Sequence, residues 1–396
     1  MISVTEARTI IDQNTFVLGT EWVPLNAMLG RVIAEDIFAP TDTPPFKQSA
    51  MDGYACNTQN TNCLNGIILD GLSEAGNKIQ TTLKQGTAQR IFTGAPLPLG
   101  ANTVIAQEKV RVEDGFIWVD PIDFLANLNI REQGSQLAKG ALAIPANTLI
   151  NAGMLGFLAG LGITNVLAYR LPKIGLLISG KELVKPGNEL AFGQIYESNS
   201  LLLHAALKEG NLSVAQTLII GDNWEETVES VKHLTSSCDI VLATGGISVG
   251  DFDFVGKAFV FTGVETLFYK VKQKPGKPLF YGKNGNTHVF GLPGNPGSVL
   301  NCFYQFVVPC IRKMTGLKPL SFKEAFLQKP WQKKSGISHF LKGFAEANQV
   351  KILESQESYK LNAFVEANCL VEIPEEITEI NTQNSVQVFY FRDAWL

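Results

Sequence analysis

The chain has 396 residues, a length typical of about two to three domains. Hydrophobic residues make up 45% and charged residues 18%, which indicates a globular rather than a disordered protein. The 33 Lys and Arg against 37 Asp and Glu give a net charge of −4, which argues against a protein that binds nucleic acid over its whole surface. We therefore expect no nucleic-acid partner.

The six cysteines and four histidines are scattered along the chain. None of the cysteines forms a CxxC pair, which argues against a structural zinc site. Six cysteines in a chain of this length do not make a disulfide framework, so we expect a cytoplasmic protein. Charged residues in the segment MISVTEARTIID argue against a signal peptide.

The chain begins with a predicted helix. Ser3 and Glu6 form a capping box ahead of an apolar-periodic run that ends near Asp12. From Phe16 to Gly140, short β-type runs are separated by Gly, Pro and Asn, which indicates one or two irregular β-rich units. The expected strands are Gly66–Asp70, Thr103–Val112 and Phe116–Val119.

The segment from Gly140 to Tyr169 carries no charge and is therefore a candidate for a membrane span. Its purely apolar centre, Ala152–Ile163, is too short to cross a bilayer. We expect a buried helix that packs closely on a neighbour, and no membrane partner.

Strands and helices alternate from Pro172 to Gly316. This alternation predicts a mainly parallel sheet covered on both faces, with ligands bound at the carboxyl ends of its strands. Beyond Lys318 the pattern predicts a small all-β domain. The expected α/β strands are Ile174–Ser179, Val214–Ile220, Ile240–Thr244, Thr266–Val271 and Thr287–Leu292; the helices are Ser198–Glu209, Trp224–Thr235, Phe252–Phe261 and Gly297–Met314; the later strands are His339–Ala345, Gln349–Leu353, Leu370–Ile373 and Asn381–Phe391.

The segment Asp239–Asp253 takes a buried strand into a glycine-rich turn. Paired glycines let backbone amides approach an anion closely. The alternative is a tight turn with Asp251 as helix cap. Asp253 fits a cap less well, and a carboxylate beside a phosphate site is a natural Mg²⁺ ligand. The residues that would face the anion are Thr244, Gly245, Gly246 and Ser248.

The segment Tyr269–Pro278 contains four lysines within eight residues. If Phe268–Gln273 is a strand, Lys270, Lys272 and Lys274 alternate onto one face. Three ammonium groups on one face repel each other unless an anion compensates them. The alternative is a solvated edge strand that lysines protect from aggregation.

The segment Gly291–Ser298 combines two prolines and three glycines between an apolar strand and a long apolar helix. Such a rigid loop typically shapes a site, and the helix start after it can bind an anion. A plain rigid turn is the alternative. The candidate substrate-binding residues are Pro293, Asn295, Pro296 and Ser298.

The segment Ser49–Ala55 follows Pro44-Pro45-Phe46 in the N-terminal half. Composition alone indicates a loop and then a short strand, with Asp52 as a turn former.

Together and in this order, these motifs resemble those of the molybdopterin molybdenumtransferases, the family of the bacterial MoeA proteins and the E domain of gephyrin. The resemblance spans nearly the whole chain. It rests on SAMDGYA at 49–55, FTGAPLP at 92–98, TGGISVGDFD at 244–253, KPGKP at 274–278 and GLPGNP at 291–296.

The resemblance implies a multidomain α/β plus β protein: a three-layer α/β molybdopterin-binding domain, β-rich N-terminal domains and a small all-β C-terminal domain. It also implies an elongated homodimer. The implied parts are an N-terminal helix at 1–14 that packs with the α/β domain, a linking or dimerisation domain at 15–40 and 136–170, a β-rich domain at 41–135 that reaches the partner subunit, the α/β catalytic domain at 171–318 and the C-terminal β domain at 319–396.

The implied reaction inserts molybdate into adenylylated molybdopterin with Mg²⁺, and yields AMP and molybdenum cofactor. An adenylylating protein would supply the substrate, and molybdoenzymes or their chaperones would receive the product. Lys270 and Lys274 match family lysines that would neutralise the anions. Asp253 matches an acidic family position and is the best candidate for a Mg²⁺ ligand, and Glu182 matches another that would share the metal or position water.

Four more site residues follow from the resemblance. Asp222 matches a family carboxylate, although it could instead form a capping box with Glu225. Asp52 and Thr93 match positions in the β-rich domain, which in this family reaches the α/β domain of the other subunit. Ser358 falls near a C-terminal family serine at the molybdate end.

Three positions depart from the family pattern. Lys181 replaces an Asp and reverses a charge beside the metal candidate, and Gln136 replaces an acidic residue. The segment Ser338–Lys342 lacks the arginines common there; Lys342 could substitute for them as a point charge.

An active molybdenum insertase is the favoured interpretation, and a non-catalytic molybdopterin-binding or scaffolding relative is the alternative. A generic nucleotide-dependent transferase is disfavoured, because the chain has neither GxxxxGK[ST] nor a GxGxxG after a strand.

Overall fold

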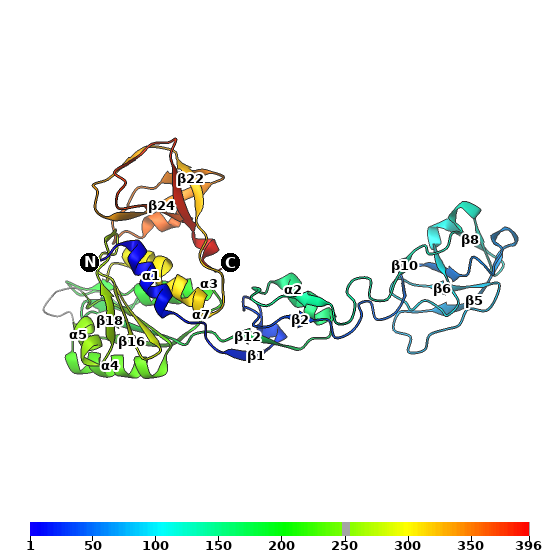
Figure 1. The fold of residues 1–396 in the computed structure, drawn as a ribbon, viewed down its shortest axis with the longest axis horizontal. Coiled ribbons are helices and arrows are strands. Elements are labelled where there is room, and N and C mark those ends of the chain that lie inside the picture. The colour runs from blue at the N-terminus through cyan, green and yellow to red at the C-terminus, as the bar shows by residue number, and fades with distance from the viewer. Residues whose placement is uncertain (248–253, 396) are drawn as a thin grey trace. The chain divides into compact units, whose positions relative to one another are not determined.

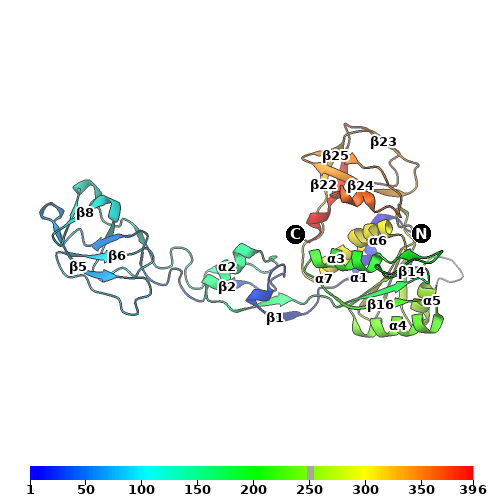
Figure 2. The same cartoon turned by 180° about the vertical axis from the view of Figure 1, so that it is seen from behind.

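The structure is a computed structural model that describes residues 1–247 and 254–395 (Figures 1 and 2). Two compact units make up the chain. Unit 1 comprises residues 1–34, 147–155 and 165–396, and unit 2 comprises residues 35–146 and 156–164.

A six-stranded sheet in the order β16-β13-β17-β21-β20-β18 forms the centre of unit 1. The first four strands are parallel, and β20 pairs antiparallel with both β21 and β18, so that β18 runs in the same direction as the first four. Their bounds are β13 Ile174–Ser179, β16 Val214–Ile220, β17 Ile240–Thr244, β18 Glu265–Tyr269, β20 Phe280–Asn284 and β21 Thr287–Leu292.

Helices cover both faces of this sheet (Figures 1 and 2). Alternate residues of β13 divide between two apolar clusters: Leu176 packs with α1, α3, α6 and α7, and Leu177 packs with α4 and α5. Burial on both faces explains why these strands are almost wholly apolar in sequence. The helices are α1 Val4–Asn14, α3 Asn199–Glu209, α4 Trp224–Ser237, α5 Phe254–Phe261, α6 Pro296–Cys302 and α7 Val308–Met314.

The predicted bounds of β13, β16, β17 and β21 are confirmed. β20 was not predicted from the sequence; it forms an antiparallel hairpin with β21 around Gly285 and Asn286. Gly285 takes the left-handed conformation that tight hairpin turns require. The sheet is therefore parallel in its centre and antiparallel at one edge.

The single long helix predicted for Gly297–Met314 is interrupted. A π-helical turn, Phe303–Val307, separates α6 from α7. Pro309 lies in the first turn of α7, and its missing N–H cannot complete a continuous α-helical ladder.

The predicted lysine strand is wrong. β18 ends at Tyr269, and Lys270 takes a left-handed conformation with φ of 70°. The next residues pair elsewhere: the Lys272 N–H donates to the Ile2 carbonyl at 2.8 Å, and β19 (Gln273–Lys274) joins the C-terminal sheet. The three lysines consequently do not share one face of one strand.

The C-terminal part of unit 1 forms a second six-stranded sheet, in the order β19-β24-β25-β22-β28-β26. A further pairing of β24 with β26 closes the sheet around its own apolar core. The predicted all-β domain is thus present. Its strands are β22 Lys323–Leu327, β23 Trp331–Gln332, β24 Ser338–Glu346, β25 Gln349–Ile352, β26 Cys369–Ile373, β27 Glu379–Ile380 and β28 Ser385–Tyr390.

Unit 2 contains a six-stranded sheet in the order β7-β4-β6-β5-β9-β8. The predicted run Thr103–Val112 is divided, because a 3₁₀ turn at Gln107–Lys109 separates β7 from β8. The strands of the sheet are β4 Gly53–Cys56, β5 Ile67–Ser73, β6 Thr87–Ile91, β7 Thr103–Ala106, β8 Val110–Glu113 and β9 Phe116–Val119.

Short strand pairs lie outside the six-stranded sheets of both units. In unit 2, β3 (Gln48–Ser49) pairs with β10 (Ile130–Arg131), and β2 (Ile37–Phe38) pairs with β11 (Leu142–Ile144). In unit 1, β1 (Thr20–Pro24) pairs with β12 (Asn165–Tyr169), and β14 (Leu183–Val184) pairs with β15 (Ile195–Tyr196).

The predictions for the two apolar helices had different outcomes. The Ser3–Glu6 capping box of α1 is confirmed, with the Glu6 N–H 3.1 Å from the Ser3 Oγ. The helix expected within Ala152–Ile163 is present as α2 (Ala152–Gly160), but the expected burial is not: Leu158 is its one buried residue in the single chain among those described. Small residues dominate α2 and offer little side chain to bury. No helix in the described part of the chain is long and apolar enough to cross a membrane.

Candidate active site

The carboxyl ends of four parallel strands meet at one edge of the central sheet. Ile178 of β13 is in register with Thr244 of β17, and Thr244 is in register with Leu292 of β21. On the other side of β13, Ser179 is in register with Ile220 of β16. This edge therefore brings together four predicted elements of the site: Glu182, Asp222, the turn at Thr244–Gly246 and the loop at Pro293–Ser298.

The turn after β17 requires its two glycines. Gly245 and Gly246 have φ of 80° and 61°, and a Cβ on Gly245 would collide with the carbonyl oxygen of Ser179. Thr244 is buried, and its Oγ1 has no hydrogen-bond partner among the described residues. A Cβ on Gly246 would likewise lie 2.8 Å from the Val255 side chain, so the two glycines let the turn pack closely against Ser179 and Val255. Ser248, Asp251 and Asp253 lie outside the described residues.

Glu182 follows β13 and folds back over Gly180. A Cβ built on Gly180 would lie 2.9 Å from Glu182 Oε2, so the carboxylate lies close above this glycine. Carboxylate oxygens are the ligands that Mg²⁺ prefers, so Glu182 fits such an ion by its chemistry. Within residues 1–247 and 254–395, no three His, Cys, Asp or Glu side chains gather as a metal site.

Asp222 does not cap the helix that follows it. The N-cap of α4 is Asn223, whose side chain accepts a hydrogen bond from the Glu226 N–H at 2.9 Å. The predicted Asp222–Glu225 capping box is therefore wrong, because the helix begins one residue later. Asp222 itself is half-buried, two residues beyond the end of β16.

The loop after β21 is bonded to the C-terminal domain. Asn295 donates from Nδ2 to the Ser358 Oγ at 2.8 Å, and the Gly297 N–H donates to the Ser358 carbonyl at 2.9 Å. A Cβ on Gly297 would lie only 2.7 Å from that carbonyl oxygen, so the close approach depends on glycine. Ser358 and the Pro293–Ser298 loop thus lie together, although they are far apart in sequence.

Lys342 holds the segment that carries Ser358. Its Nζ donates to the carbonyls of Ser355, Glu357 and Lys360 at 2.6, 3.3 and 2.9 Å. The residue is buried, with 3% of its surface exposed, and burial lowers the pKa of its ammonium. The expectation that Lys342 could replace an arginine as an anion ligand is wrong, because backbone carbonyls occupy its donors.

The two family lysines lie on either side of a turn. Lys270 lies with its Nζ 5.0 Å from the centre of the Tyr269 ring, and the Tyr269 hydroxyl donates to the Ile247 carbonyl beside the glycine turn. Lys274 is exposed on β19. Between them, Lys272 forms an ion pair with Glu375 at 3.7 Å. Lys272 is thus neutralised by a carboxylate of the C-terminal domain, whereas Lys270 lies beside Tyr269 and Lys274 is exposed.

Asp52 and Thr93 lie together in unit 2. The Thr93 N–H and Oγ1 both donate to Asp52 Oδ1, at 2.7 and 2.8 Å. These hydrogen bonds lower the pKa of Asp52 and hold it as a carboxylate. The pair is accessible to solvent on the loops before β4 and after β6.

Asn199 contacts the site loop and was missed by the sequence analysis. It is the first residue of α3, is 9% exposed, and donates from Nδ2 to the Gly294 carbonyl at 2.8 Å. Beside it, the buried Glu197 accepts a hydrogen bond from the Ser200 N–H at 2.8 Å. From the sequence alone, an asparagine at a predicted helix start indicates a helix cap, and nothing in the pattern shows that its side chain binds the loop after β21.

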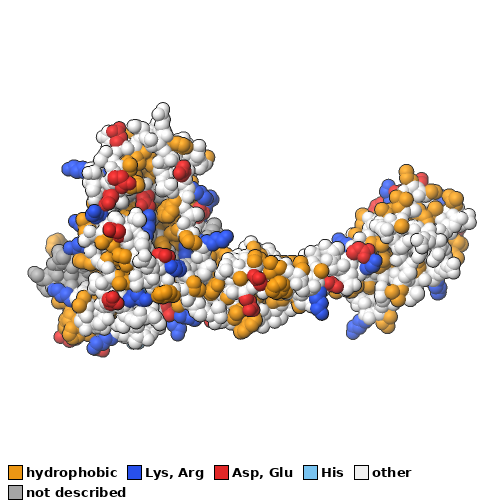
Figure 3. Space-filling model, in the orientation of Figure 1, with side chains coloured by type: hydrophobic (Ala, Val, Ile, Leu, Met, Phe, Trp, Pro, Cys, Tyr) orange, Lys and Arg blue, Asp and Glu red, His pale blue; other side chains and the backbone are white. Residues whose placement is uncertain are grey.

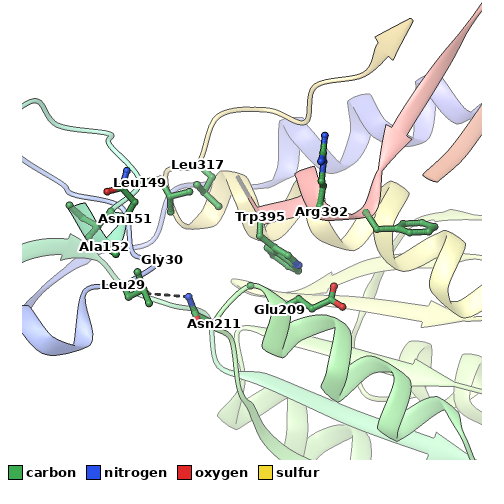
Figure 4. A pocket seen from close by; sticks show the side chains of 13 residues that line it. Leu29, Gly30, Leu149, Asn151, Ala152, Glu209, Asn211, Leu317, Arg392 and Trp395 are labelled. Atoms are coloured by element: carbon green, nitrogen blue, oxygen red, sulfur yellow. Dashed lines mark hydrogen bonds between the residues drawn. The ribbon is translucent and has the colours of Figure 1, made fainter. Parts of the chain in front are cut away.

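A cavity of about 700 Å³ lies elsewhere in unit 1 (Figure 4). Its walls are mostly apolar, and it contains none of the predicted site residues. Leu29, Leu149, Glu209, Asn211, Arg392 and Trp395 are among the residues that line it.

Comparison with known proteins decides the family. Residues 2–162 match the MoeA N-terminal region (domains I and II), residues 180–313 a probable molybdopterin binding domain, and residues 324–391 the MoeA C-terminal region (domain IV). A molybdopterin molybdenumtransferase of Haemophilus influenzae is 35% identical over 98% of both chains. The chain belongs to the molybdopterin molybdenumtransferase family.

Other relatives agree with this assignment. A molybdopterin molybdenumtransferase of Nostoc is 36% identical over 75% of this chain and 70% of its own. The crystal structure of a molybdopterin biosynthesis MoeA protein from Pyrococcus horikoshii covers 99% of both chains, with a TM-score of 0.82 and 28% identity. The resemblance and fold class expected from the sequence are thus confirmed, and the chain is a transferase of molybdenum cofactor biosynthesis.

Proposed function

We propose that this transferase inserts molybdate into adenylylated molybdopterin and releases AMP and molybdenum cofactor. One observation carries the proposal: the glycine turn, the Pro293–Ser298 loop and Ser358 of the C-terminal domain all lie at the carboxyl edge of the sheet. Ligands of such sheets bind at this edge. A substrate with phosphates needs the backbone access that the glycine turn offers.

The charges at this edge suit anionic reactants. Lys270 and Lys274 would neutralise molybdate and the phosphates, an electrostatic contribution of the kind that dominates phosphoryl transfer. Glu182, together with Asp253, would hold Mg²⁺, and Asp222 lies beyond the neighbouring strand. When bound, Mg²⁺ would offset charge on the phosphates of the substrate. The lysines would therefore contact the anionic reactants directly, and the carboxylates would hold the cation that offsets the same negative charge.

We further propose a homodimer in which Asp52 and Thr93 serve the α/β edge of the second copy, as in the family. Apolar residues exposed on the isolated chain support an interface. Figure 3 shows apolar side chains on the surfaces of both units. Exposed examples include Trp22, Leu29, Phe38 and Leu142, each at least 47% exposed.

We place the reaction in the cytoplasm, where an adenylylating protein would supply the substrate and molybdoenzymes or their chaperones would take the product. All six cysteines are unpaired thiols in the structure. Unpaired thiols suit a reducing compartment.

The test is direct reconstitution. Purified protein is incubated with adenylylated molybdopterin, molybdate and Mg²⁺, and both AMP and active cofactor are quantified. We expect equal amounts of the two products, and no AMP when Mg²⁺ is chelated. Binding of the nucleotide without AMP release would instead identify a non-catalytic relative, and would direct attention to Lys181 and Gln136.

A further inference from the structure

A histidine of the C-terminal domain lies next to Lys274. β19 and β24 pair in parallel, with Gln273 in register with Ser338 and Lys274 in register with His339. Side chains alternate between the faces of a strand, so Lys274 and His339 share one face. Gln273 and Ser338 are buried on the other face, whereas Lys274 is exposed and His339 is half-buried.

The surroundings of His339 are positively charged. Burial lowers the pKa of the imidazole, and the charges of Lys333 and Lys274 lower it further. The Lys333 Nζ is fixed nearby by the carbonyls of Ile337 and Glu375, at 3.0 and 3.2 Å. The other charged groups of the adjoining segments have partners of their own. Lys272 forms an ion pair with Glu375, and Glu372 forms one with Arg8. Glu375 and Glu376 face Lys333.

This arrangement makes the protonation of His339 dependent on an anion. Without one, two ammonium groups and the cost of burial oppose a third positive charge. A dianion bound at Lys274 would offset both ammonium groups and make the imidazolium favourable. The imidazolium then donates a charge-assisted hydrogen bond to the anion.

We propose that His339 is a second oxyanion ligand beside Lys274, and that molybdate binding is coupled to proton uptake at His339. The inference rests on the proposed function, since it takes Lys274 as an oxyanion-binding residue. The proton comes from solvent to a ring nitrogen, and no other bond forms or breaks. His339 would thereby supply the side-chain donor that the missing arginines of the segment Ser338–Lys342 do not.

The direction of the pH dependence follows from linkage. His339 is neutral in the free protein at neutral pH, and the bound anion raises its pKa. Molybdate affinity therefore increases as the pH falls toward the ordinary histidine range, and becomes independent of pH in alkaline solution.

The experiment is isothermal titration of the full chain with molybdate alone. We expect roughly tenfold tighter binding at about pH 6 than at about pH 8, the gain of one charge-assisted hydrogen bond. Titration in two buffers with different ionisation enthalpies measures proton uptake directly. His339→Gln is expected to bind molybdate with little pH dependence and no uptake.

The matched control is His233→Gln, because His233 lies on α4 with its Nε2 bonded to Gln216, away from β24. This variant is expected to match the wild type, and melting temperatures verify that both variants are folded. Undiminished pH dependence in His339→Gln, no proton uptake by the wild type, or no molybdate binding would each overturn the inference.

The reconstitution assay separates this inference from the proposed function. Proton-coupled molybdate binding without AMP release would uphold His339 and contradict the proposed function. AMP release with pH-independent molybdate binding would do the reverse.

Discussion

In unit 2, Asp52 is oriented by one residue, Thr93, through two short hydrogen bonds. In unit 1, the site is assembled from four strand ends and from a segment of the C-terminal domain that Lys342 holds. In unit 2, one neighbouring residue is therefore enough to orient the carboxylate. The site in unit 1 depends on contacts between parts of the chain that are far apart in sequence.

This difference predicts different responses to mutation. Changes at Asp52 or Thr93 should alter chemistry and leave the fold of unit 2 intact, because both side chains are accessible. Changes in the supports of the unit 1 site should alter stability and substrate binding together. The predictions below test this contrast, from the largest expected effect to the smallest.

Lys274→Ala is expected to lower turnover about 100- to 1000-fold, because it removes a charge that stabilises the anionic reactants. Lys274 is exposed, so the melting temperature should change little. The reconstitution assay measures the effect. Lys232→Ala removes an equal charge from the surface of α4 and serves as the control. Equal turnover in the two variants would remove Lys274 from the site.

Lys342→Met is expected to lower the free energy of unfolding by about 3 kcal/mol, because three backbone carbonyls lose the donor that a buried ammonium supplies. Denaturant unfolding measures this. The KM for the substrate should rise as well, because the segment with Ser358 loses its support. Lys351→Met in the same domain removes only an exposed ion pair with Glu366 and should cost less than about 1 kcal/mol. Similar losses in both variants would contradict the assignment.

Acid should destabilise unit 1 selectively. All four histidines lie in unit 1, and burial lowers the pKa of His288 to about 4. The unfolded chain takes up this proton near the ordinary pKa of 6.5. Stability is therefore lost as the pH falls from about 6.5 to about 4, by about 3 kcal/mol from this group.

Hydrogen exchange at pH 7 and pH 5 measures the acid response separately in each unit. We expect loss of protection in the central sheet of unit 1, and less of it in His288→Gln. Equal loss in the sheet of unit 2 would show that His288 is not the cause.

Thr93→Val is expected to lower turnover about tenfold, because Asp52 keeps its charge and one backbone hydrogen bond but loses the hydroxyl donor. Thr93→Ser retains the hydroxyl and should stay near wild type. A large fall in the melting temperature of Thr93→Val would instead mean that the pair supports the fold.

The sequence predicted best what depends on local pattern. The bounds of β13 and β17 follow from apolar runs that are buried on both faces, and the cap of α1 follows from Ser3 and Glu6. The five motifs then identified the family, which supplied the fold of the domains that have weak patterns of their own.

Three of the failures share a physical cause, which is contact with residues distant in sequence. The lysine segment reads as a strand, but Ile2 and β24 pair with it and divide it at Lys270. Lys342 reads as a free charge, yet the carbonyls that bind it lie 13 to 18 residues away. No local pattern shows that Asn199 reaches Gly294. Such contacts exist only once segments that are distant in sequence have folded together.

The most direct test of the account is complementation between subunits. Asp52→Asn and Lys274→Ala are each expected to retain less than about 1% of wild-type turnover. The two variants are co-expressed with different tags, and the mixed dimers are purified through both tags. If Asp52 of one copy serves Lys274 of the other, each mixed dimer has one intact site and recovers about half of the wild-type AMP release. Background activity in the purified mixed dimers would contradict the shared site.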